Sequence, residues 1–71
     1  MAYPNIEAER VKSGMTKGAF AKAIDSSPDT IKRWQSGNAS IPASKIVAMA
    51  TLFNVTTDYL LGRTDRTAAG A

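Results

Sequence analysis

Hydrophobic side chains recur at steps of three and four residues along most of this chain, and residues that favour turns separate the repeats. That spacing is typical of short amphipathic helices, each with one apolar face. Gly14, Gly37 and Gly62 stand where three of the repeats stop, as expected for residues that end helices. The pattern predicts helices at about residues 5–13, 17–24, 28–36, 42–53 and 57–61. The predicted fold class is therefore all-α, a compact bundle of five helices.

The starts of these helices carry residues suited to a helix N-terminus. A Ser, Thr, Asp or Asn before the first turn can accept a hydrogen bond from an N–H group that has no partner inside the helix. Proline fits the first helical position, because that position needs no N–H. Pro28 and Pro42 take this place in the third and fourth helices. The predicted N-caps are Asn5, Thr16, Ser27 and Thr56.

The apolar faces of the helices predict the core. Phe20, Ala21 and Ile24 share one face of the second helix, and Ile31 and Trp34 share one face of the third. An alternative role for the tryptophan is stacking on bases, but its spacing from the isoleucine favours burial. The other core candidates are Ile6 and Val11 in the first helix and Ile46, Met49, Ala50 and Phe53 in the fourth.

Residues 14–37 contain two short amphipathic helices in succession, with the polar turn Asp25-Ser26 between them. Aspartate tolerates the left-handed backbone of such turns better than most residues, though less well than glycine. This is the layout of a helix-turn-helix, in which the second helix can enter the major groove of DNA. It points to a protein that reads DNA sequence rather than to an enzyme.

Length and charge limit the number of domains and the kind of partner. A chain of 71 residues allows one small domain. The residues from Arg63 onward are small or polar, which predicts disorder, so we assign the domain to residues 1–65 and a tail to residues 66–71. Nine Lys and Arg against six Asp and Glu give a net charge of +3, which is compatible with a polyanionic partner.

The residues that are missing exclude several classes of function. The sequence has no cysteine and no histidine, so it lacks disulfides, thiolate metal sites and the commonest general base. The carboxylates are scattered and no serine or threonine has a plausible base, so we expect no enzyme, no cofactor and no metal. The start does not resemble a signal peptide, and no apolar stretch approaches the ~18 residues of a membrane span. We expect a cytoplasmic protein with no membrane partner.

Candidate base-reading residues lie on the third helix, opposite Ile31 and Trp34. Arginine can bond the O6 and N7 atoms of guanine together, and lysine can reach the same atoms or a phosphate. An aspartate there could accept a hydrogen bond from a cytosine amino group, or act only on the helix dipole. A solvated helix face is the plainer alternative for these side chains. The predicted base contacts are Pro28, Asp29, Lys32 and Arg33.

Candidate phosphate contacts surround that helix. Small hydroxyl and amide side chains bind phosphate oxygens well, and lysines on the flanks add positive charge. Ordinary helix capping is the alternative role for some of these groups. The predicted phosphate contacts are Thr16, Lys17, Ser27, Thr30, Ser36, Asn38, Ser40 and Lys45.

Two stretches of the chain stand in the register of a known family. The first holds Gly14-Met15-Thr16, Phe20-Ala21, Thr30-Ile31 and Trp34-Gln35-Ser36-Gly37, and the second is the closing stretch NVTTDYLLGRTD from Asn54 to Asp65. Ile6, Arg10 and Ala50 extend the match to residues 5–65. On these residues the chain resembles the Cro/repressor helix-turn-helix family of phage repressors and bacterial regulators.

The resemblance implies a lambda repressor-like fold and a DNA-bound homodimer. In the family, the positions that match Pro28, Asp29, Lys32 and Arg33 read bases. The region of Tyr59, Leu60 and Leu61 borders the dimer interface in similar repressors, and we expect the first two of these side chains to be half core and half surface.

The chain also departs from the family pattern at four positions. Lys17 replaces a glutamine that contacts phosphate, Asp25 replaces the glycine of the turn, and Ser26 replaces an apolar residue. Gln35 replaces a glutamate that pairs with the arginine of the first helix. We expect Arg10 to keep a hydrogen bond to Gln35 but to lose the charge pair.

Taken together, these features predict a sequence-specific DNA-binding transcriptional regulator, of the phage or prophage repressor type, that binds a palindromic double-stranded operator through the helix at 28–36. The alternative is a protein-interaction module on the same fold, such as an antitoxin or an adaptor, for which DNA binding is secondary.

Overall fold

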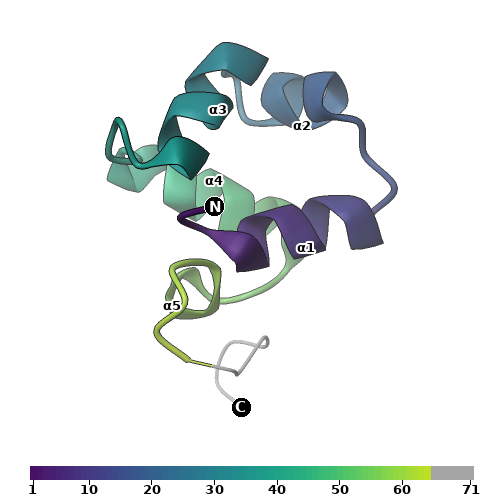
Figure 1. Cartoon of the computed structure of the whole chain (residues 1–71). Helices are drawn as coiled ribbons and strands as arrows, with labels where there is room; N and C mark the ends of the chain where they lie inside the picture. The colour runs from purple at the N-terminus through teal and green to yellow at the C-terminus, as the bar shows by residue number, and fades with distance from the viewer. Residues whose placement is uncertain (65–71) are drawn as a thin grey trace.

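The computed structural model describes residues 1–64, which form five α-helices and confirm the all-α fold class. In Figure 1, α2 and α3 lie together on one side of the molecule, with α4 behind α3 and with α1 and α5 on the opposite side. The helices are α1 (Pro4–Lys12), α2 (Lys17–Ala23), α3 (Pro28–Ser36), α4 (Ala43–Phe53) and α5 (Thr57–Leu60). The bounds of α3 are those predicted, and the other helices differ from the prediction by one residue at one or both ends.

Three of the four predicted N-caps are confirmed. Thr16, Ser27 and Thr56 each accept a hydrogen bond from the backbone N–H three residues further on. The fourth prediction is wrong: α1 begins at Pro4 with Tyr3 as its N-cap, because proline has a φ suited to the first turn and no N–H to satisfy. Asn5 is used elsewhere, since its Nδ2 donates to the Tyr59 carbonyl at 2.7 Å and joins α1 to α5.

Most of the predicted core is buried. The buried cluster holds Ile6, Phe20, Ile24, Trp34, Ile46, Met49 and Leu60, with Ile31, Ala50 and Phe53 packed partly exposed against it. The ring centroids of Phe20 and Phe53 lie 5.4 Å apart, and this contact connects α2 to α4. Two expectations about burial are wrong. Val11 is 61% exposed, because it stands five residues after Ile6 and so faces away from it, and Leu60 is fully buried rather than half exposed.

A polar contact inside the bundle reinforces the link between α1 and α5. Glu9 is buried, and the Tyr59 hydroxyl donates to its Oε2 at 3.2 Å. Burial, together with this hydrogen bond to a carboxylate, raises the pKa of the Tyr59 hydroxyl. The closing α5 is therefore held by its buried leucine and by two polar contacts with α1.

The described chain ends shortly after α5. The Arg63 N–H donates to the Asp58 carbonyl at 2.8 Å, and the disorder expected from Arg63 onward stays a prediction. The predicted tail at 66–71 lies outside the described residues. Within residues 1–64, none of the helices has the length and hydrophobicity that crossing a bilayer requires.

Replacing Trp34 by alanine tests the core assignment. We expect a loss of ~3–5 kcal/mol in the free energy of unfolding, or an unfolded protein, because a large side chain that is 4% exposed leaves a cavity. Val11→Ala, on the exposed side of α1, should change stability by no more than about 0.5 kcal/mol. Urea denaturation followed by circular dichroism measures both, and equal midpoints for the two variants would contradict the assignment.

Candidate nucleic-acid interface

The turn between α2 and α3 sets the direction of α3 relative to α2. Asp25 has a φ of +55°, which confirms the left-handed backbone expected at this position. The Ser26 N–H donates to the Ala21 carbonyl at 2.8 Å, and the Asp25 N–H donates to the Lys22 carbonyl at 3.1 Å. These bonds satisfy carbonyls at the end of α2. In helices that end this way, glycine usually occupies the left-handed position that Asp25 takes here.

A lysine from α4 donates hydrogen bonds to this turn. The Lys45 Nζ donates to the Ile24 carbonyl at 2.8 Å and to the Asp25 carbonyl at 2.9 Å. A cation at this position also interacts favourably with the negative end of the α2 dipole. Two of its three donors are therefore used within the protein. The phosphate contact predicted for Lys45 stays a prediction and can draw on the remaining donor.

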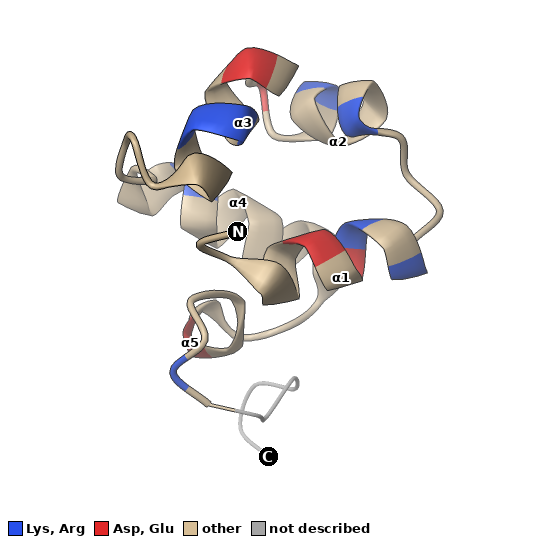
Figure 2. Cartoon of the chain, viewed as in Figure 1, with Lys and Arg blue, Asp and Glu red and all other residues tan. Residues whose placement is uncertain are grey.

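The four predicted base-reading residues share the exposed side of α3. Pro28, Asp29, Lys32 and Arg33 are all exposed, whereas Trp34 is buried. A shallow hollow of about 260 Å³ runs along this side, lined by Asp29, Lys32, Arg33, Ser36 and Asn38. Figure 2 shows acidic charge at the start of α3 and basic charge along its middle. The helix thus presents hydrogen-bonding and charged groups outward while its tryptophan anchors the opposite face.

The hydroxyl groups around α3 are engaged locally. The Ser27 and Thr30 hydroxyls share a hydrogen bond of 2.9 Å, and the Ser36 hydroxyl donates to the Arg33 carbonyl at 3.0 Å. Thr16 accepts from the Ala19 N–H at 3.1 Å. Hydroxyl oxygens can take part in more than one hydrogen bond, so these contacts leave room for phosphate. Asn38 and Ser40 lie exposed in the loop after α3.

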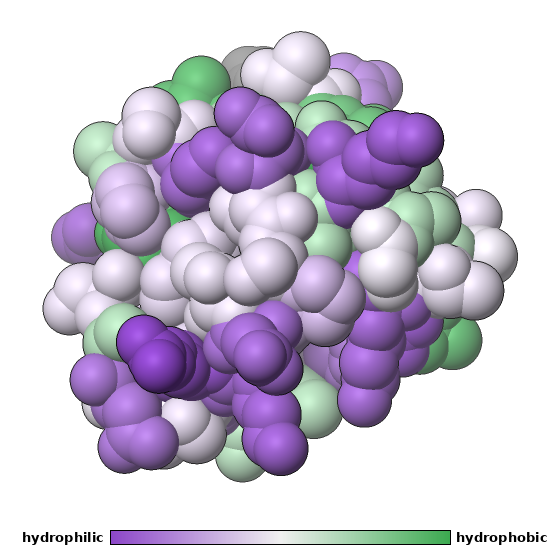
Figure 3. Space-filling view, turned by 90° about the horizontal axis from the view of Figure 1, so that it is seen from above, coloured by the Kyte–Doolittle hydropathy of each residue, from purple (hydrophilic) through white to green (hydrophobic). Residues whose placement is uncertain are grey.

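A second and larger hollow lies between α1, α2 and α3. It has a volume of about 460 Å³, and exposed Lys17 and Lys32 line it together with the buried Phe20 and the half-buried Ile31. The first residue of α2 and the middle of α3 therefore border the same surface. Seen from the side on which α2 and α3 lie, the molecule presents strongly hydrophilic side chains with weakly polar ones between them, and the strongest hydrophobic colour stays at the margins (Figure 3).

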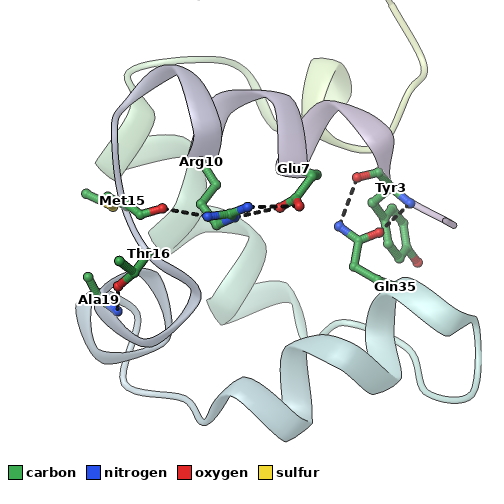
Figure 4. Close-up of polar contacts among 7 residues, drawn as sticks. All are labelled: Tyr3, Glu7, Arg10, Met15, Thr16, Ala19 and Gln35. Atoms are coloured by element: carbon green, nitrogen blue, oxygen red, sulfur yellow. Dashed lines mark hydrogen bonds and ion pairs between the residues drawn. The ribbon is translucent and has the colours of Figure 1, made fainter.

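Arg10 borders this hollow but does not contact Gln35, so the predicted hydrogen bond between them is wrong. The Arg10 guanidinium instead donates two hydrogen bonds to Glu7, from Nε to Oε1 at 2.6 Å and from Nη2 to Oε2 at 2.9 Å (Figure 4). Its Nη1 donates to the Met15 carbonyl at 2.6 Å. The hydrogen bond from Arg10 lowers the pKa of the Glu7 carboxyl. Glu7, one turn before Arg10 in α1, is thus the partner of the arginine in place of Gln35.

Gln35 makes a different long-range contact that the sequence did not predict. Its Oε1 accepts from the Tyr3 N–H at 2.8 Å, and its Nε2 donates to the Tyr3 carbonyl at 2.9 Å (Figure 4). An amide can donate and accept at once, whereas a carboxylate can only accept. The amide at position 35, where the family usually has a glutamate, therefore indicated a side chain that both donates and accepts. It did not indicate that Tyr3 is the partner.

The three residues expected near a dimer interface differ in what they offer. Leu61 is 37% exposed and Tyr59 is half-buried, whereas Leu60 has no exposed surface. The dimer role stays a prediction, and it can draw only on Tyr59 and Leu61. Within residues 1–64, no group of three or more Asp, Glu, His or Cys side chains could hold a metal ion.

Comparison with known proteins identifies the family to which the fold belongs. A family model described as helix-turn-helix matches residues 6–60, which include the complete α2–turn–α3 unit. The chain belongs to the Cro/repressor-type helix-turn-helix family. Membership supports a DNA-binding regulator. No curated protein and no solved structure gave a significant match.

Replacing Lys45 by methionine tests its role beneath the turn. We expect a loss of about 1–2 kcal/mol in the free energy of unfolding, because two carbonyl groups lose a charged donor while the methionine keeps the packing of the side chain. Thermal and urea denaturation measure the loss. Lys12→Met, on the exposed end of α1, should leave stability nearly unchanged. Wild-type stability in Lys45→Met would contradict the role.

Proposed function

We propose that this protein is a sequence-specific transcriptional regulator of the phage or prophage repressor type, which binds a palindromic DNA operator through α3. The observation that carries the proposal is the exposed side of α3. Lys32 and Arg33 project from the face opposite the buried Trp34. The helix-turn-helix family places the corresponding helix in the major groove.

In the proposed complex, α3 reads bases. Arg33 has the chemistry for a bidentate contact to guanine O6 and N7, and Lys32 for the same atoms or a nearby phosphate. Asp29 can accept a hydrogen bond from the amino group of cytosine. Pro28, at the start of the helix, brings an apolar ring and no N–H to the groove.

Residues around α3 anchor the protein to the backbone. Lys17 borders the same hollow as Lys32, so a strand of DNA along it would meet both cations. Contacts to phosphate fix register and orientation but carry little sequence information. The proposed anchors are Thr16, Lys17, Ser27, Thr30, Ser36, Asn38, Ser40 and Lys45.

We further propose that two copies bind a two-fold symmetric operator, with half-sites separated by about one helical turn of DNA, ~34 Å. Tyr59 and Leu61 are the candidates for contacts between the copies, because they retain exposed surface at the end of the bundle opposite α3. Occupancy of the operator would then exclude RNA polymerase sterically, which requires neither cofactor nor metal.

The salt dependence of binding tests whether DNA is the ligand. Each neutralised phosphate contributes about −0.9 to the slope of log K against log salt for double-stranded DNA. We expect a steep decline in affinity for operator fragments selected from a random pool, measured by fluorescence anisotropy from about 50 to 200 mM salt. An affinity that does not change with salt, or no shift of genomic fragments in a gel, would favour a protein-interaction module instead.

A pair of variants tests which residues read and which anchor. Arg33→Ala should lose its preference at one operator position in each half-site, since a bidentate guanine contact contributes ~1–3 kcal/mol of discrimination. Lys17→Ala should weaken binding to all sequences nearly equally and make the salt slope shallower by about one unit per subunit. Binding to a panel of single-base operator variants at two salt concentrations measures both effects. If Arg33→Ala keeps the wild-type order of preference, Arg33 is an anchor and not a reader.

A further inference from the structure

The segment before α1 is fastened to the end of α3 by three hydrogen bonds, all of them to Gln35. The Ala2 N–H donates to the Gln35 main-chain carbonyl at 2.7 Å. The Gln35 side chain adds the two bonds to Tyr3 described above, which run in opposite directions. We call these three bonds the Gln35 clamp. It joins residues 32 or more positions apart in the sequence.

The clamp completes the hydrogen bonding at the C-terminus of α3. The last carbonyls of a helix have no partner within it. Here the Arg33 carbonyl accepts from the Asn38 N–H at 3.0 Å and the Trp34 carbonyl from the Gly37 N–H at 3.1 Å, both within the turn that follows. The next carbonyl, that of Gln35, takes its hydrogen from Ala2 instead. The end of α3 is thus satisfied in part by a distant segment.

The core holds this end of the helix through apolar contacts. Residues 37–40, which follow α3, are all exposed, whereas Trp34 is buried and Ile31 and Ile41 pack against the core on either side of it. The N-terminal end of α3 is held separately, by the turn and by Lys45. Apolar packing is non-directional, whereas hydrogen bonds depend on direction, and the Gln35 clamp adds such bonds beside Trp34.

The clamp lies next to the base-reading side chains. Gln35 follows Lys32 by three residues, one turn of the helix, and Arg33 by two. Lys32, Gln35 and Ser36 line the larger hollow together with Met1, so the fastened segment forms part of its border. A small tilt at this end of α3 would move the reading groups relative to the bases, and a bidentate contact requires both donors in line.

We infer that Gln35 is a positioning residue, which sets the orientation of α3 by clamping it to residues 2 and 3 and thereby sharpens the choice between DNA sequences. This inference rests on the proposed function, because it concerns how well α3 reads DNA. Gln35 itself need not touch DNA. In this chain the clamp takes over the role of a link between α1 and α3, since Arg10 is committed to Glu7 and Met15.

Gln35→Met is the main test, because methionine keeps the size of the side chain and removes both polar bonds. The measured quantity is the ratio of dissociation constants for unrelated DNA and for the selected operator, at one salt concentration and a temperature at which circular dichroism shows folded protein. We expect this ratio to fall about tenfold, the equivalent of one to two net hydrogen bonds. Affinity for unrelated DNA should stay within about twofold of the wild-type value, because phosphate contacts dominate it.

Asn5→Ala is the matched control. It removes another amide that reaches a distant backbone group, but that bond joins α1 to α5 and not to α3. Asn5→Ala should therefore lower stability by a similar amount and keep the wild-type ratio. If both variants lower the ratio equally, the effect comes from general destabilisation and the inference is overturned.

Hydrogen exchange supplies an independent test. In the free wild-type protein, the amides of Ala2 and Tyr3 should exchange more slowly than those of the exposed loop residues Ala39 and Ser40, and Gln35→Met should remove the protection at Tyr3. Unprotected wild-type amides, or a wild-type ratio in Gln35→Met, would overturn the inference while the proposed function stands. A wild-type protein that does not distinguish DNA sequences would overturn both.

Discussion

The burial of Trp34 is the interaction on which the outward face of α3 depends. Its indole is 4% exposed and belongs to the same cluster as Phe20 and Ile24 of the preceding helix. Lys32 stands two residues before Trp34 and Arg33 two residues after Ile31, each about 200° round the helix, so packing these two apolar side chains against the core turns Lys32 and Arg33 toward solvent. The packing of the core and the proposed recognition of DNA therefore depend on the same rotation of α3 about its axis.

Rotation alone does not fix a helix, and three further devices constrain α3. The left-handed backbone at Asp25 sets the angle of the turn, at a cost of about 1–3 kcal/mol for a residue with a side chain. Lys45 offsets part of that cost by bonding two carbonyls of the turn. The Gln35 clamp holds the opposite end. The last two devices join a short element to a distant one, as a domain this small requires because helices of this length are not stable alone.

Local features of the sequence were sufficient to predict the elements themselves. The bounds of α3 followed from Ser27, Pro28 and Gly37, whose effects act within one or two turns. The core stripes followed from helical spacing, apart from Val11, where the apolar residue lay off the stripe. Hydrogen bonds from long side chains to distant backbone could not be predicted. The Lys45 contacts span 20 and 21 residues and the Asn5 contact 54, and any of several carbonyls could have served as acceptor.

At the candidate site, too, local features could be predicted and long-range contacts could not. The face of α3 was predictable from its rotation relative to Ile31 and Trp34, whereas the links that orient it were not. Arg10 illustrates the reason. The family pattern pointed to residue 35, but Glu7 lies one turn away on the same helix and offers a full charge, so the nearer carboxylate takes the guanidinium.

These links matter because charge by itself does not distinguish one DNA sequence from another. Nine Lys and Arg are offset by six Asp and Glu to leave a net charge of +3, and Lys45 already uses two of its donors inside the fold. Asp29 adds a negative charge to the very helix that the proposed complex brings to DNA. Attraction to phosphates grows with the number neutralised and is much the same for every DNA sequence. In the proposed complex, selectivity would therefore come from the alignment of a few side chains, and the attachments at the two ends of α3 would set that alignment.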